Sequence, residues 1–115
     1  MDSNLITDIP YQSLNGPKAL KTLSLKNNKI KTIKRNDFGA QKNLNKLILT
    51  GNDLISIDGG SFTGLNNLNE IYLSSNSLSR FNSDVFSGMS VKNFFFFLGR
   101  ENDFFFFPRF FYLNL

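Results

Sequence analysis

Residues able to carry out acid–base, nucleophilic or metal chemistry are scarce in this chain. Its 115 residues include no cysteine and no histidine, which excludes thiolate chemistry, disulfides, cysteine–histidine metal sites and histidine acid–base catalysis from its own side chains. Asp53 and Asp58 lie close in sequence, but they occupy variable positions and have no partner acid at a defined spacing. No nucleophile–base pair or phosphate-cradling glycine loop is visible. We therefore predict that the chain is not an enzyme and needs no cofactor or metal.

Positive charge is concentrated in one part of the sequence. The net charge is +4, and nine of the 13 basic residues lie between Lys18 and Lys46, with Asp37 as the only acid among them. Such a segment could bind anions or nucleic acid. Its basic residues have no aromatic residue among them before Phe38, although aromatic side chains are what unpaired bases stack on. A solvated face is therefore favoured, and nucleic acid is disfavoured as a partner.

An internal repeat must position these side chains. Seven columns keep one constant spacing through three copies: Leu20, Leu44 and Leu68; Leu23, Leu47 and Ile71; Leu25, Leu49 and Leu73; Asn28, Asn52 and Asn76; Ile30, Leu54 and Leu78; Ile33, Ile57 and Phe81; Phe38, Phe62 and Phe86. The spacing continues backwards to Asn4, Ile6, Ile9 and Leu14. We therefore expect a partial leading repeat over 1–19 and three full repeats over 20–91, so that the chain begins partway through a repeat.

Three segments carry the motif that identifies this pattern: LKTLSLKNNKI, LNKLILTGNDL and LNEIYLSSNSL. They resemble the leucine-rich repeat consensus over residues 4 to about 91. The period of about 24 residues, with a phenylalanine near its end, resembles the class common in extracellular receptors and matrix proteins. The resemblance implies an α/β-type repeat solenoid, a horseshoe segment with short parallel strands on its concave face and a mostly irregular or 3-10 convex side.

Each column has a physical reason. The alternation Leu23-Ser24-Leu25 is typical of a strand that turns its apolar side chains inward. Stacked copies bury one another, since no single coil can cover its own apolar face. The asparagines are expected to bridge the backbone of adjacent coils, because an amide both donates and accepts hydrogen bonds. None of them begins a glycosylation sequon. The phenylalanine column is expected to stack inside the coil.

The pattern fails after about Val91. Continuing at the same spacing puts Lys92 at a core position and Arg100 at the asparagine position, and moving back by one residue puts Gly99 there instead. Residues 92–115 form a degenerate tail, and 10 of the 14 phenylalanines lie in 94–115. Three interpretations stay open: a hydrophobic anchor or aggregation-prone strand pair, a divergent capping repeat, and a stretch rich in T translated in error. We favour the last, since natural caps carry a polar outer face, and sequencing the transcript across the Lys92 codon tests it.

The family resemblance makes the concave sheet the expected binding surface. Its outward positions are predicted to be Thr22, Ser24, Lys26, Lys46, Ile48, Thr50, Glu70, Tyr72 and Ser74. Exposed Ile48 beside exposed Tyr72, rimmed by charge, has the composition of a small protein-contact patch. Alternatively, these two residues are good strand formers that pack against each other without any partner.

We expect a protein–protein interaction module whose partner is a protein ligand or the neighbouring repeats of a parent protein. The leading hypothesis is a fragment of a receptor or matrix ectodomain, located outside the cell or at its surface and serving signalling. The alternative is an intracellular, cytoplasmic scaffold, which the missing cysteines and sequons favour slightly. The sequence shows no secretory signal and no apolar stretch near the ~20 residues that a membrane span needs. A membrane anchor would therefore belong to the parent protein.

Overall fold

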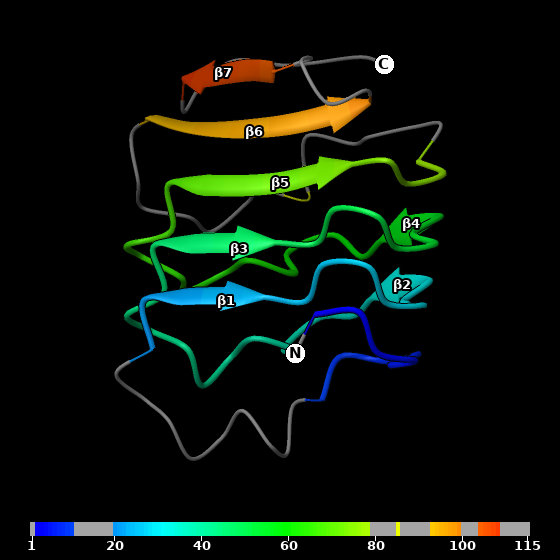
Figure 1. Ribbon diagram of the computed structural model, residues 1–115. Coiled ribbons are helices and arrows are strands. Elements are labelled where there is room, and N and C mark those ends of the chain that lie inside the picture. Colours follow the sequence, from blue (N-terminus) through cyan, green and yellow to red (C-terminus); the bar gives the residue numbers. More distant parts are fainter. Residues whose placement is uncertain (1, 11–19, 79–84, 86–92, 100–103, 109–115) are drawn as a thin grey trace.

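Short strands, paired in parallel except for the last, form the two sheets of the molecule. The computed structural model describes residues 2–10, 20–78, 85, 93–99 and 104–108. The strands are β1 (Thr22–Ser24), β2 (Thr32–Ile33), β3 (Lys46–Ile48), β4 (Ser56–Ile57), β5 (Glu70–Ser74), β6 (Asn93–Gly99) and β7 (Phe104–Pro108). They form a five-stranded sheet in the order β1-β3-β5-β6-β7 and a two-stranded sheet of β2 and β4. Figure 1 shows the small sheet across the coils from the large one.

The register of the first three strands reproduces the repeat. Leu23 pairs with Leu47, and Leu47 pairs with Ile71, both in parallel. The pairing extends past the ends of the strands, where the amide of Asn27 donates to the carbonyl of Thr50 at 2.9 Å. The predicted solenoid of short parallel strands is therefore confirmed.

β6 joins the sheet at a different spacing. Ile71 pairs with Phe96 and Leu73 with Leu98, so the offset is one residue longer than the repeat period. The two frames tried for this segment in the sequence were the repeat period itself and a shift back by one residue. Neither gives the observed pairing of β5 with β6. β7 then returns antiparallel to β6, with Phe96 opposite Phe105. The phenylalanine-rich segment thus supplies two strands of the sheet, out of step with the repeat.

The core consists of columns of apolar side chains, and each coil contributes one residue to each column. Leu47 of β3 and Ile71 and Leu73 of β5 are fully buried, as are Leu25 and Leu49, which directly follow β1 and β3. Phe38 and Phe62 come from adjacent coils, and their rings stack with centroids 6.2 Å apart and an angle of 18° between the ring planes. Their burial confirms the core interpretation of the first two phenylalanines. Phe86, Phe81 and Leu14, which the pattern also places inside, lie outside the described residues.

The asparagine column forms the expected ladder between coils. Asn52 Nδ2 donates to the carbonyl of Leu49 in its own coil at 2.9 Å and to that of Leu25 in the preceding coil at 3.0 Å. Its Oδ1 accepts the amide of Ile30 at 3.2 Å. Asn76 repeats all three contacts one coil further on. Each side chain thus pairs buried backbone groups that would each cost roughly 1–3 kcal/mol if unsatisfied.

The far side of the coils is only partly irregular. Tight turns dominate it, with hydrogen bonds between residues three apart, such as Gly39 N to Asn36 O at 3.0 Å and Gln41 N to Phe38 O at 2.9 Å. The two-stranded sheet of β2 and β4 adds regular pairing there, with Ile33 opposite Ile57. The sequence predicted a mostly irregular or 3-10 convex side and did not predict this small sheet.

Candidate protein-binding surface

The outward side chains of β1, β3 and β5 form two columns on the large sheet. Strand alternation puts Leu23, Leu47 and Ile71 inside, and these are at most 5% exposed. The flanking residues therefore face outward, and the register aligns them in two rows: Thr22, Lys46 and Glu70; Ser24, Ile48 and Tyr72. Six of the predicted positions are thus brought together on one face. Of these, Thr22 is exposed and the others are half-buried.

Three side chains at one end of this face contact one another, and we call Lys46, Glu70 and Tyr72 the Tyr72 cluster. The Tyr72 hydroxyl donates to Glu70 Oε1 at 2.9 Å. Lys46 Nζ lies 3.9 Å from Glu70 Oε2 and 5.8 Å from the centroid of the Tyr72 ring. The ring is therefore held in place by a hydrogen bond at its hydroxyl and a cation near its ring.

The electrostatics of the cluster order the side chains more than they stabilise the fold. The Lys46 and Glu70 side chains are about one-third exposed, and ion pairs of this kind typically contribute roughly 0.2–1 kcal/mol. Burial raises the pKa of the Tyr72 hydroxyl above 10.0, and the hydrogen bond to Glu70 and its charge raise it further. The phenol therefore remains a neutral donor at physiological pH. An aromatic anchor fixed before binding loses less conformational entropy on binding.

The opposite end of the face is closed by a residue that the sequence pattern did not reveal. Asp2 Oδ1 accepts the Ser24 hydroxyl at 2.5 Å and the amide of Lys26 at 3.0 Å. Ser24 is therefore already engaged within the chain. The sequence signal that could have revealed this contact is the repeat period, since counting back by one repeat from Lys26 gives Asp2.

The third predicted column, Lys26, Thr50 and Ser74, is only partly available. Lys26 is exposed and Thr50 half-buried, whereas Ser74 is 3% exposed. Ser74 was expected to face outward, and the structure contradicts this. Ser74 is the last residue of β5 and lies between the coil of Thr50 and Gly99 of β6.

The carboxylates considered for catalysis lie apart from this face. Asp53 and Asp58 are both exposed and follow the asparagine ladder and β4, respectively. Near Asp58, the pKa of Asp37 is raised above 3.8, chiefly by burial, against the lowering effects of the Lys34 amide and charge. Within the described ranges, no group of three or more carboxylate, cysteine or histidine side chains could hold a metal ion.

Helices long and apolar enough to cross a membrane do not occur in the described part of the chain. Against known protein families, the model described as "Leucine rich repeat" matches residues 1–54 and again residues 42–93. The two matches overlap and together span more than half of the chain. None of the curated proteins compared with the chain matches it.

Proposed function

The chain belongs to the leucine-rich repeat family, and from that premise we propose that it binds a protein partner through the outward face of β1, β3 and β5. Its membership supports a protein–protein interaction module in general terms. The observation that carries the finer proposal is the Tyr72 cluster together with Ile48. Ile48 is paired directly with Tyr72 in the register of β3 and β5. Interface hot spots are enriched in aromatic anchors surrounded by a polar rim, and this face has that arrangement.

The size of the surface fits one region of a larger contact. Stable interfaces bury roughly 800 Å² on each partner, from about 20–30 residues. The described coils offer fewer outward residues than this, so the contact would continue onto further repeats of a parent protein. We propose that the parent is a receptor or matrix ectodomain that acts in signalling at the cell surface. The second candidate is a cytoplasmic scaffold, favoured by the absence of cysteine.

A photoreactive amino acid placed at Tyr72 tests the face, with the same amino acid at Ile55 as the matched control. Ile55 is a large apolar residue that is 60% exposed and lies off this face. Proteins cross-linked from position 72 and not from position 55 would then be purified, and their affinity measured for the unmodified chain, Tyr72→Ala and Ile55→Ala. We expect Tyr72→Ala to weaken binding by about 30-fold, the loss typical of a hot-spot residue, and Ile55→Ala to leave binding unchanged.

The fold of both variants is checked by thermal unfolding. Tyr72 is only half-buried, so Tyr72→Ala should leave the array folded at the assay temperature. Equal affinity of Tyr72→Ala and the unmodified chain would overturn the proposed face. To decide the setting, the transcript on both sides of this segment should be sequenced. Cysteine-rich capping segments would support the ectodomain, and caps without cysteine the scaffold.

A further inference from the structure

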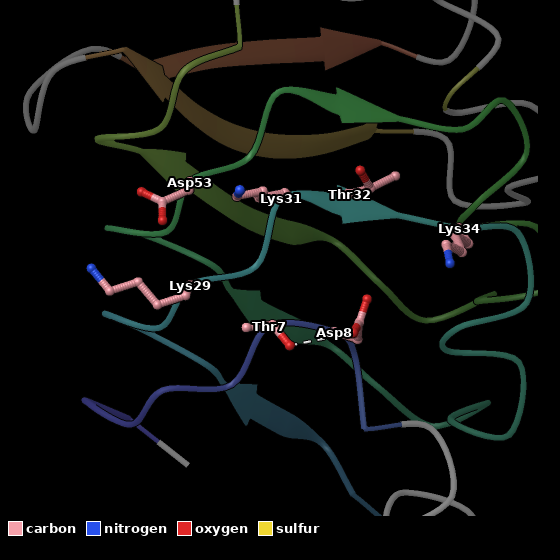
Figure 2. A pocket seen from close by; sticks show the side chains of 7 residues that line it. All are labelled: Thr7, Asp8, Lys29, Lys31, Thr32, Lys34 and Asp53. Atoms are coloured by element: carbon pink, nitrogen blue, oxygen red, sulfur yellow. Dashed lines mark hydrogen bonds between the residues drawn. The ribbon is translucent and has the colours of Figure 1, made fainter.

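A hollow of about 570 Å³ lies on the other side of the coils, lined by Thr7, Asp8, Lys29, Lys31, Thr32, Lys34 and Asp53. Figure 2 shows these side chains rising from three successive coils, with the lysines of the middle coil between Thr7 and Asp8 on one side and Asp53 on the other. We propose that this hollow binds a phosphate or sulfate group. The inference concerns a different surface from the protein-binding face and does not depend on it.

The backbone puts Lys29 and Lys31 on the same side of the chain, whereas Lys34 stands apart from them (Figure 2). Ile30 and Ile33 are fully buried, so the residues on either side of Ile30 point outward. Lys29 and Lys31 are both exposed, and residues two apart in an extended chain lie about 6.5 Å apart. From α-carbons at that separation, the two flexible side chains can bring their ammonium groups to opposite oxygens of one tetrahedral anion. Thr32 lines the same hollow and supplies a hydroxyl donor, whereas the Thr7 hydroxyl donates to Asp8.

Lys29 and Lys31 form no ion pair within the described residues, although Asp8 and Asp53 also line the hollow. In the described part of the chain, the one ion pair within 4 Å joins Lys46 and Glu70, on the other surface. Asp8 accepts the Thr7 hydroxyl at 3.3 Å, which occupies one of its oxygens. Lys34 is different, because its amide donates to Asp37 and its charge acts on that carboxylate. Lys29 and Lys31 are therefore the main anion ligands, and Lys34 a weaker one.

The repeat shows that this cluster belongs to one coil alone. The positions one repeat after Lys29, Lys31 and Lys34 are Asp53, Ile55 and Asp58, and those one repeat before are Leu5, Thr7 and Pro10. A long polyanion lying across successive coils would meet carboxylates at the next one. The charge pattern therefore fits a compact oxyanion, seated between Thr7 and Asp53, rather than an extended strand of negative charge.

The test is a titration of the full isotope-labelled chain with phenyl phosphate and with phenyl sulfate, followed by NMR at constant ionic strength. Saturable shifts are expected at the amides of Thr7, Lys29, Lys31 and Thr32. Tighter binding of one ester identifies whether the site prefers the phosphate or the sulfate group, and similar affinities mean that it accepts both. Shifts that follow ionic strength alone, without saturation, would overturn the proposal.

Charge variants separate a site from general attraction. Replacing both main ligands in Lys29→Gln/Lys31→Gln should weaken binding about fivefold, since each exposed pair contributes modestly. The matched control Lys21→Gln/Lys42→Gln removes the same charge from exposed positions outside the hollow, and it should change affinity less than twofold. Asp53→Asn should strengthen binding about twofold by removing a competing carboxylate. Equal weakening by both double variants, or weaker binding by Asp53→Asn, would contradict the site.

Discussion

The side chains of the asparagine column form hydrogen bonds that link adjacent coils. Asn28 Oδ1 accepts the amides of Asn4 and Ile6, from the coil before it, at 3.1 and 3.3 Å. The sequence predicted this role correctly, because the asparagine column recurs at a fixed position and an amide suits a buried turn. It also predicted six outward residues of the sheet. The burial of Ser74 was missed, because strand alternation predicts the direction of a side chain and not how far its neighbours cover it.

The pKa of Asp37 gives a pH-dependent prediction at this scale. The folded pKa is higher than 3.8, so the folded chain holds the Asp37 proton more tightly than the unfolded chain does. This contribution to stability is complete below pH 3.8 and is lost as the pH rises through the folded pKa. Asp37→Asn keeps an oxygen that can accept the Lys34 amide. It should therefore unfold at a higher temperature than the unmodified chain at pH 7, with the difference vanishing near pH 3.

Calorimetry at the two pH values checks this difference. Asp37→Ala is the control, because it removes the acceptor that lies 2.8 Å from the Lys34 amide, and it should be less stable than Asp37→Asn at both pH values. A stabilisation by Asp37→Asn that is the same at pH 3 and pH 7 would show that ionisation of Asp37 does not limit stability.

At the scale of the element, each coil turns through a left-handed residue just before its ladder asparagine. Ser3, Asn27, Gly51 and Ser75 occupy this position, with φ between 57° and 76°. The turn itself was expected at the asparagine column, but its left-handed conformation was not predicted, because its residue types differ from copy to copy. At Gly51, a Cβ would run into Asn27 Oδ1. Glycine is therefore favoured at this corner in one coil unless the Asn27 side chain moves, and serine or asparagine occupies it in the others.

Ser75→Gly should stabilise the array. A non-glycine residue in the left-handed region costs roughly 1–2 kcal/mol, and the greater freedom of glycine in the unfolded chain offsets roughly 0.5–1 kcal/mol of that gain. We expect a net increase of about 0.5 kcal/mol in the free energy of unfolding, measured by urea denaturation. Ser77→Gly is the matched control, since Ser77 is also exposed and is not among the described residues with positive φ. It should lower stability, and a gain from both substitutions would contradict the argument from φ.

The strands show why the end of the array was harder to predict than its centre. In β1, β3 and β5, the inward apolar residues recur at one constant spacing, so the register follows from the repeating columns. In β6, Phe94 to Phe97 are identical, and a uniform run fits every register equally well. The observed offset, which exceeds the repeat period by one residue, therefore had no signal in residue type.

At the scale of the whole molecule, the coils form a one-dimensional stack, and we propose a binding role for two of its sides. Ladder asparagines bond to their own coil and to the coil before it, as in the pairs Asn4–Asn28 and Ile30–Asn52. The large sheet carries the proposed protein-binding face, and the opposite side carries the hollow at Lys29 and Lys31. The hollow was only hinted at by the basic segment, for which a solvated face was favoured. Its lining comes from three coils, and only stacking reveals which side chains meet.

Such a stack should respond to a core change according to the place of the coil. Leu47 is fully buried between Leu23 and Ile71, so Leu47→Ala weakens two coil interfaces. A substitution of this kind costs roughly 2–5 kcal/mol, a large part of the stability of a small domain. Hydrogen exchange should therefore accelerate in β1 and β5 alike. Leu23→Ala, in the first strand of the sheet, should accelerate exchange in β1 far more than in β5, because each coil in a solenoid is stabilised by its nearest neighbours. Equal acceleration of β1 and β5 by Leu23→Ala would show instead that the array unfolds as one indivisible unit.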